Sequence, residues 1–243
     1  MIVEHLVFFK LKDGYTQEQE NDMYKGLWSF KDRYNSIMSM SLGRTMIRNV
    51  DGVTHVLYMR FPTKEALTEY LNDRYRLEIS YKYIVPVFNG ELVCDFEAEM
   101  ESDLASLYRE GENFEHGLEH VELFKVKEDT PASQIEEILS AFAELPKKAG
   151  TRIAQLTAGI NYTAGQKYTF GLVARLPSVE ALGAMLEDRA YQEVLEQCYP
   201  ILEDHLQAAY PVDDSLSRVD EPYSNCRVLT PTASQAITAA QHR

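Results

Sequence analysis

The chain has 243 residues, 45% of them hydrophobic, which is enough apolar material for one large core or two smaller ones. Lys and Arg number 24 against 38 Asp and Glu, and the resulting net charge of -14 disfavours binding to nucleic acid or to an anionic membrane surface. Its three cysteines lack C-x-x-C spacing, which is typical of reduced cytoplasmic thiols rather than of a disulfide framework.

We expect no targeting signal in the N-terminal residues. They lead directly into an alternating pattern, without the basic region and long apolar stretch of a signal peptide. No apolar run approaches the ~18 residues of a membrane helix. We therefore expect a cytoplasmic protein whose partners include neither a membrane nor a nucleic acid.

An internal repeat organises the chain. The segment that begins at Glu4-His5 reappears 115 residues later at Glu119-His120, and two further blocks recur at the same distance. Such a period indicates tandem copies of one structural unit. We predict a first domain over residues 1–99, an acidic linker over 100–116, a second domain over 117–211, and a tail of low order over 212–243.

Each copy has the pattern of a β-α-β-β-α-β unit. Alternating residues predict the first strand, and the cap signal Thr16-Gln17-Glu18-Gln19 predicts the start of the first helix. Pro62-Thr63 caps the next helix, and Asp73-Arg74 has a structural helix-start or ion-pair role, as does Asp188-Arg189. The predicted elements of the first copy are strand 2–11, helix 17–33, strands 38–47 and 53–61 joined by a turn at 49–52, a helix after residue 63, a helical stretch over 73–83, and strand 91–97.

The first strand is apolar on both faces, because Val7 and Phe9 alternate with Leu6 and Phe8. Both helices of such a unit lie on one face, and leaving the other face wet would cost about 25 cal/mol for each Å². We predict the α+β class, with two ferredoxin-like domains whose sheets pack together as an intramolecular dimeric α/β barrel. Pairing between two chains, which gives a homodimer, is the alternative.

Three segments carry a resemblance to a known family, namely 3–12, 52–56, and Tyr70 followed by Asp73-Arg74. They resemble the stress-responsive dimeric α/β barrel family and, within it, plant olivetolic acid cyclase. The resemblance covers both copies, about residues 1–98 and 117–211. It implies a cavity between sheet and helices and, for most members, a stress response without an assigned activity. The cyclase closes a polyketide ring without a cofactor, using a pocket His and Tyr.

The resemblance transfers only in part. His5, Tyr24, His55 and Tyr70 fall at pocket positions, but the catalytic His of the cyclase aligns with Arg76. Arginine cannot accept a proton at neutral pH, although it can bind a carboxylate or an enolate oxygen. The second copy is more divergent: Tyr70, His55 and Arg76 correspond there to Met185, Phe170 and Tyr191, which leaves His120.

Candidate site residues follow from this alignment and from the strand faces. His5 and His55 lie on neighbouring strands, on the same face, where they could share a proton or a ligand. The catalytic candidates are His5, His55, Tyr70 and Arg76, and the substrate-binding candidates are Val7, Phe9, Tyr24, Leu57 and His120.

A metal site is not expected. His116, His120 and Glu122 alternate along one strand face, but residues four apart on a strand are ~13 Å apart, too far for the two histidines to share an ion. We expect no metal and no cofactor.

Three functions are compatible with the sequence, and it leaves open whether the chain is an enzyme. The first is a stress-response barrel that binds a small apolar or aromatic ligand without catalysis. The second is a cofactor-independent cyclase, isomerase or lyase, with His5 or His55 as base, Tyr70 as donor and Arg76 as anion clamp. The third is a haem protein similar to chlorite dismutase, with His205 as the axial ligand.

Overall fold

A computed structural model describes residues 1–47, 51–100, 117–148 and 152–212. The first copy contains, in chain order, β1 (Ile2–Leu11), α1 (Gln17–Arg33), β2 (Ser39–Arg44), β3 (His55–Phe61), α2 (Lys64–Asn72), α3 (Arg74–Ile79), a π-helical turn η1 (Ser80–Ile84) and β4 (Phe88–Ala98). The second contains β5 (Leu118–Val126), α4 (Ala132–Ala143), the 3₁₀ turn η3 (Leu145–Lys147), β6 (Gln155–Ile160), β7 (Phe170–Leu176), α5 (Val179–Glu187), α6 (Arg189–Cys198), the 3₁₀ turn η4 (Tyr199–Ile201) and β8 (Leu202–Pro211).

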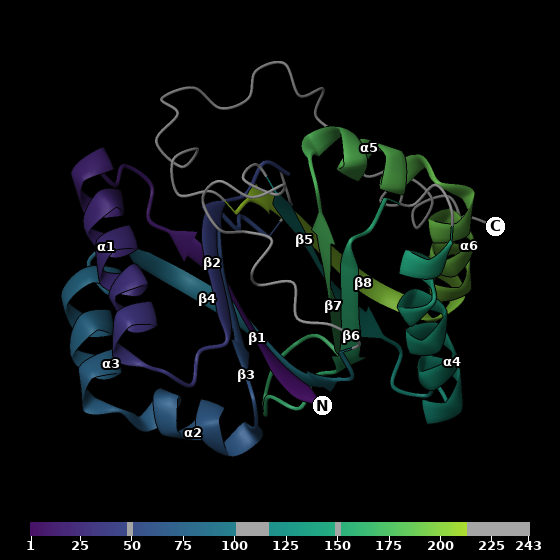
Figure 1. Ribbon diagram of the computed structural model, residues 1–243, viewed down its shortest axis with the longest axis horizontal. Helices are drawn as coiled ribbons and strands as arrows, with labels where there is room; N and C mark the ends of the chain where they lie inside the picture. Colours follow the sequence, from purple (N-terminus) through teal and green to yellow (C-terminus); the bar gives the residue numbers. More distant parts are fainter. Residues whose placement is uncertain (48–50, 101–116, 149–151, 213–243) are drawn as a thin grey trace.

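The strands form two antiparallel sheets of four, in the orders β2-β3-β1-β4 and β6-β7-β5-β8. Figure 1 shows the two sheets facing each other at the centre of the molecule, with α1 to α3 on one outer side and α4 to α6 on the other. The predicted fold class, with two ferredoxin-like units joined within one chain, is confirmed. Most of the predicted linker and tail lies outside the described residues.

The helix starts agree with the cap signals in the sequence. Thr16 Oγ1 accepts a hydrogen bond from Gln19 N at 3.2 Å, and the Gln19 side chain accepts one from Thr16 N at 2.9 Å, so α1 begins with a capping box. Asp73 and Asp188 cap α3 and α6 by accepting from backbone N–H groups at 2.8 Å. The helix-start role predicted for both aspartates is therefore confirmed.

The edges of the two sheets join into a barrel. The second strand was predicted to continue to residue 47, but β2 ends at Arg44, because Met46 N leaves its own sheet and donates to Ala209 O of β8 at 2.7 Å. At the opposite edge, Tyr162 N donates to Asp95 O of β4 at 2.9 Å.

Glycine permits the close approach at both edges. A Cβ at Gly43 would lie 2.5 Å from the Tyr210 ring, and one at Gly159 would lie 2.5 Å from Glu97 O. Any larger residue would push the strands apart.

The space between the sheets is largely apolar but has a charged centre. Leu6 and Phe8 of β1 pack there with Val121 and Leu123 of β5. The centre holds two buried ion pairs at corresponding positions, Arg60 with Glu4 at 2.5 Å and Arg175 with Glu119 at 3.2 Å. Contacts across the interface satisfy them: Thr157 donates to Glu4 at 2.8 Å, and Arg175 donates to Ser39 at 2.8 Å. The sequence predicted the apolar faces but not this polar centre.

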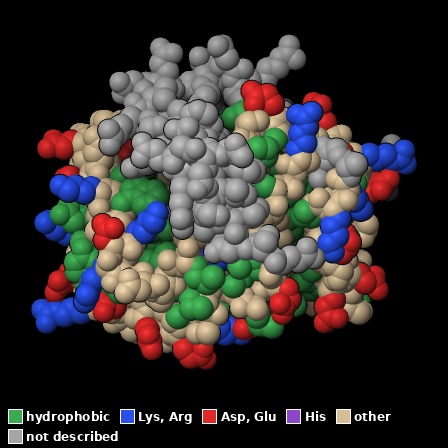
Figure 2. Space-filling view, in the orientation of Figure 1, with side chains coloured by type: hydrophobic (Ala, Val, Ile, Leu, Met, Phe, Trp, Pro, Cys, Tyr) green, Lys and Arg blue, Asp and Glu red, His purple; other side chains and the backbone are tan. Residues whose placement is uncertain are grey.

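The described surface mixes charges of both signs. Figure 2 shows acidic and basic side chains interspersed with small apolar areas on the visible face. Cys94 and Cys198 are free and buried, whereas Cys226 lies outside the described residues. Among the helices that the structure describes, none is both long and apolar enough to cross a membrane.

Candidate functional site

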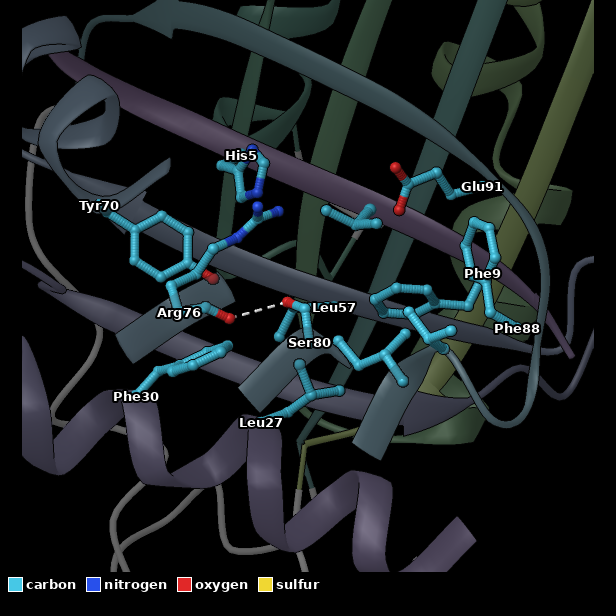
Figure 3. A pocket seen from close by; sticks show the side chains of 13 residues that line it. His5, Phe9, Leu27, Phe30, Leu57, Tyr70, Arg76, Ser80, Phe88 and Glu91 are labelled. Carbon is cyan, nitrogen blue, oxygen red and sulfur yellow. Dashed lines mark hydrogen bonds between the residues drawn. The ribbon is translucent and has the colours of Figure 1, made fainter. Parts of the chain in front are cut away.

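A cavity of about 190 Å³ lies in the first copy, between the sheet and its helices. It is larger than the ~150 Å³ engineered cavity that binds benzene, so it has room for about one aromatic ring. Its walls are mostly apolar, with a few polar groups (Figure 3). The lining residues are His5, Val7, Phe9, Leu27, Phe30, Leu57, Tyr70, Arg76, Ser80, Ile84, Val85, Phe88 and Glu91.

Two local features of the chain shape this cavity. Alternation along β1 directs His5, Val7 and Phe9 to the helical side of the sheet. The helix that covers them changes from α to π at Ser80, and the π turn supplies Ser80 and Ile84 to the wall. Single π turns within α-helices are frequent at functional sites.

His5 is paired with an aspartate that the sequence analysis did not identify. The antiparallel register of β1 and β4 places His5 directly opposite Asp95, so the two side chains lie on the same face. His5 Nδ1 is 2.5 Å from Asp95 Oδ1, and both residues are buried. Because a carboxylate only accepts, Nδ1 carries the proton, and Nε2 of the neutral ring is left as an acceptor.

Tyr70 and Arg76 lie beside His5 at the same end of the cavity (Figure 3). The Tyr70 ring centroid is 6.2 Å from that of His5 and 5.9 Å from Arg76 Cζ. Burial raises the pKa of Tyr70, and the nearby Arg76 charge opposes this only partly. Tyr70 therefore stays a protonated hydrogen-bond donor at neutral pH, next to a permanent cation.

Phe9, Phe88 and Glu91 lie at the other end of the cavity (Figure 3). Phe9 is buried, Phe88 is half-buried, and Glu91 is exposed. The cavity is therefore polar and cationic at one end, and apolar at the other with an acidic rim.

The structure brings six of the nine predicted site residues together around this cavity: His5, Val7, Phe9, Leu57, Tyr70 and Arg76. Their catalytic and binding roles stay predictions. The other three, His55, Tyr24 and His120, lie outside the lining.

His55 and His5 are not neighbours in the sheet, so the predicted sharing of a proton is wrong, and His55 does not line the cavity beside His5. In the β1–β3 register, His55 lies opposite Phe9, whereas His5 lies opposite Met59, four residues further along the strand. His55 has its own acid, with Nε2 2.7 Å from Glu20 Oε1. The Tyr24 ring packs edge-on against His55 with 5.8 Å between centroids.

Arg44 also binds Glu20, the partner of His55. Arg44 Nε donates to Glu20 Oε1 at 3.1 Å, and Arg44 Nη2 donates to Glu20 Oε2. Burial lowers the pKa of His55, although Glu20 opposes this. Burial alone would raise the pKa of Glu20, but hydrogen bonds from His55 and Arg44 outweigh it and lower that pKa. The His55–Glu20 hydrogen bond and the Arg44–Glu20 ion pair tie β3 and β2 to α1.

In the second copy, the fully buried Glu122 gathers polar side chains on the helical side of the sheet. Tyr191 OH donates to Glu122 Oε1 at 2.6 Å, and Gln207 Nε2 donates to Oε2 at 2.9 Å. His205 Nε2 is 2.6 Å from Oε2. His120 Nε2 lies 3.0 Å from Oε1, at an angle that gives an electrostatic contact rather than a hydrogen bond.

These contacts bear on two predictions from the sequence, His205 as a haem ligand and His120 as a substrate-binding residue. The atom of His205 that would ligate haem iron bonds to Glu122 instead, and its ring stacks on Phe124 with 4.4 Å between centroids. His120 is buried against Glu122 rather than directed at a ligand cavity. His116 lies outside the described residues, and within those residues no cluster of three His, Cys, Asp or Glu could hold a metal ion.

About half of the residues that line the cavity were not predicted from the sequence. Asp95 could have been found by pairing the predicted last strand with the first in antiparallel register. No periodic signal in the sequence marks the π turn that supplies Ser80. The other lining residues that were not predicted are Leu27, Phe30, Ile84, Val85, Phe88 and Glu91.

The fold and the cavity together define a tandem ferredoxin-like α/β barrel with room for a small molecule under its first sheet. The model of the Stress responsive A/B Barrel Domain family matches residues 3–98 and 118–212. The chain belongs to this family, which confirms the family resemblance in the sequence. The further likeness to olivetolic acid cyclase stays a prediction.

One similar protein is a stress-response A/B barrel domain-containing protein of Arabidopsis thaliana. It is 25% identical over 194 residues, which span 76% of this chain and 70% of that protein.

Solved structures of similar length share the tandem fold. A candidate monooxygenase from Fusobacterium nucleatum has a TM-score of 0.60 at 9% identity, with 87% of this chain and 92% of that chain covered. An anthrone oxidase-like protein also has a TM-score of 0.60, at 13% identity, with 87% and 90% covered. At such identities the likeness shows the fold alone.

Proposed function

We propose that the first copy of this stress-response barrel binds a small, largely apolar molecule, about one aromatic ring in size, that carries an acidic or carbonyl oxygen. The observation that carries this proposal is the cavity of about 190 Å³ with Arg76, Tyr70 and His5 at one end. Apolar walls with a few convergent polar groups are typical of small-molecule sites.

Charge supports an oxygen-bearing ligand. Arg76 is half-buried at the cavity wall, and a guanidinium there recognises a carboxylate or enolate oxygen through hydrogen bonds and charge together. The apolar end, with Phe9 and Phe88, accommodates a ring. The ligand would therefore lie with its oxygen toward Arg76 and its hydrocarbon part toward Phe9.

Calorimetric titration with benzoate and with toluene tests this orientation. We expect both probes to bind wild type in a one-to-one ratio, and Arg76→Gln to weaken benzoate at least tenfold while toluene is retained. Arg74→Ala is the matched control, because Arg74 is exposed and lies outside the cavity lining. Failure of either probe to bind wild type, or equal benzoate affinity in wild type and Arg76→Gln, would contradict the proposal.

A second candidate is a cofactor-independent enzyme that moves a proton on such a ligand. The observation that favours it is the His5–Asp95 pair, because a neutral His5 ring that donates from Nδ1 to Asp95 presents Nε2 as a general base. In this proposal Nε2 takes a proton from a carbon next to the carbonyl. Arg76 and Tyr70 stabilise the enolate oxygen. Return of the proton to a different carbon completes an isomerisation; in a ring closure, the enolate carbon attacks a second carbonyl of the same molecule and His5 returns the proton to the new alkoxide oxygen.

Solvent deuterium exchange into acetophenone, followed by NMR, tests the second candidate. Wild type should label the methyl carbon faster than buffer, and His5→Asn should remove the acceleration. His55→Asn is the matched control, since His55 is buried and bonded to an acid but lies outside the cavity. No acceleration by wild type, or equal losses in both variants, would eliminate His5 as the base.

A further inference from the structure

The acid that pairs with His5 is itself held by the second copy. Asp95 uses Oδ1 for His5 Nδ1 and Oδ2 for Thr163, whose Oγ1 donates at 2.8 Å. Thr163 belongs to the segment between β6 and β7, in the other half of the chain. A continuous set of hydrogen bonds therefore runs from the first-copy cavity, through Asp95, into the second copy.

The same segment also fixes the backbone of Asp95. Asp95 N donates to Asn161 Oδ1 and to Thr163 Oγ1, both at 3.1 Å, and Asp95 O accepts from Tyr162 N at 2.9 Å. Three consecutive residues of the second copy thus bond to one residue of the first.

The segment is held in place by bonds of its own. Thr163 N donates to Asn161 Oδ1 at 3.0 Å, and Asn161 Nδ2 donates to Tyr168 O at 3.0 Å. Further along, Gln166 accepts from Val93 N of β4 at 3.2 Å. Asn161 and Thr163 are therefore pre-positioned, and Asp95 meets a rigid partner rather than a loose loop.

We propose that Thr163 is a positioning residue of the first-copy site, acting through Asp95 on His5. The Thr163 hydroxyl occupies Oδ2 and fixes the carboxylate rotamer, so that Oδ1 faces Nδ1 of His5. That choice keeps the proton on Nδ1 and leaves Nε2 free for the cavity. The functional meaning of this inference rests on the proposed function, but the tautomer itself does not.

The second copy has no such arrangement at the corresponding place. His120 lies opposite Ala209, where His5 lies opposite Asp95, so there is no acid for a threonine to hold. The second copy contributes instead to the site of the first, and the first-copy site is incomplete without it. Because the two copies are joined in one chain, every first-copy site is built with the segment between β6 and β7 beside it.

Nitrogen-15 NMR of the histidine rings in the ligand-free full chain tests the proposal. In wild type we expect the protonated-nitrogen signal of His5 at Nδ1 and the unprotonated signal at Nε2. Thr163→Val, which keeps the shape but removes the hydroxyl, should move both signals toward the average of the two tautomers. Thr163→Ser should restore the wild-type pattern, and Thr68→Val, on an exposed helix position, should not change it.

Two outcomes would overturn the inference: a wild-type proton on Nε2, or wild-type His5 signals in folded Thr163→Val. If the valine variant does not fold, as judged from its amide spectrum, Thr163→Ala provides the same comparison without the added methyl.

The NMR result and the proposed function fail separately. Normal tautomer behaviour without benzoate or toluene binding removes the proposed function alone, whereas binding with an unchanged tautomer in Thr163→Val removes this inference alone.

Discussion

The two copies share one fold but place different side chains in the space under their sheets. On β1, Val7 and His5 face a cavity, whereas the corresponding Glu122 and His120 on β5 belong to a buried polar cluster. The strand partners differ too: Phe9 lies opposite Glu91, and Phe124 lies opposite His205.

The helices that cover the two sheets differ between the copies as well. In the first copy, α3 is followed by the π turn, and Arg76 is half-buried at the cavity wall. In the second, α6 continues as a regular α-helix to Cys198, and Tyr191, at the position of Arg76, is fully buried with its hydroxyl on Glu122. The sheet and caps therefore specify the fold, while a few inward positions decide between a cavity wall and a buried polar cluster.

Glu122→Ala should give the largest change that this comparison predicts. The substitution leaves His205 and the Tyr191 hydroxyl without their common acceptor and removes the carboxylate beside His120, which should lower the free energy of unfolding by about 3–5 kcal/mol. Val7→Ala, at the corresponding position beside the cavity, should cost only about 1–2 kcal/mol. Urea denaturation of both variants measures the difference, and equal losses would mean that the Glu122 cluster contributes no more than ordinary packing.

Low pH should lower the stability of the second copy because Glu122 becomes protonated. Burial alone would raise the pKa of Glu122, but the His120 and His205 contacts outweigh it and hold the pKa well below its usual value of 4.5. Because the unfolded chain takes up this proton first as pH falls, the stability from Glu122 is complete above about pH 4.5 and is lost progressively below it.

Glu122→Gln removes this titration. Denaturant midpoints from pH 5 to pH 3 should therefore show wild type losing about 2 kcal/mol more than the glutamine variant, from about 1.4 kcal/mol per pH unit. Parallel pH curves for the two proteins would exclude Glu122 as the acid-sensitive group.

The two barrel edges should respond unequally to one methyl group. A Cβ at Gly159 meets the backbone oxygen of Glu97, which cannot move without disturbing β4, whereas a Cβ at Gly43 meets the side chain of Tyr210. We expect Gly159→Ala to cost about 2–3 kcal/mol and Gly43→Ala about 1–2 kcal/mol, as overpacking does elsewhere. Thermal unfolding of both variants checks the order, and a larger loss in Gly43→Ala would show that the Tyr210 ring is the more rigid neighbour.

Local signals in the sequence were sufficient for the fold. The repeat, the alternation along the strands, and the caps at Thr16 and Asp73 are short-range features, and each survives in the structure. The apolar second face of the first strand correctly predicted that the sheets pack together.

The site could be predicted where a strand face or the family resemblance placed a residue. Val7 and Phe9 were found from the strand face, and Tyr70 and Arg76 from the resemblance. The alternation gives the face but not the register, so His55 was placed beside His5 although four residues separate their positions along the strands. The Asp95 partnership depends on strands 90 residues apart, and the Glu122 cluster depends on partners from three elements, for which no short sequence pattern exists.

Where the two copies are the same, substitutions should have the same small effect. Arg74 and Arg189 follow the two capping aspartates, and each Nε lies 2.8 Å from a glutamate one turn later, Glu78 or Glu193. Both arginines are more than nine-tenths exposed, so solvent screens the ion pairs and side-chain entropy offsets them. Arg74→Ala and Arg189→Ala should therefore leave the urea midpoint within measurement error of wild type. A clear loss in only one variant would show that the copies differ at their surfaces as well as beneath their sheets.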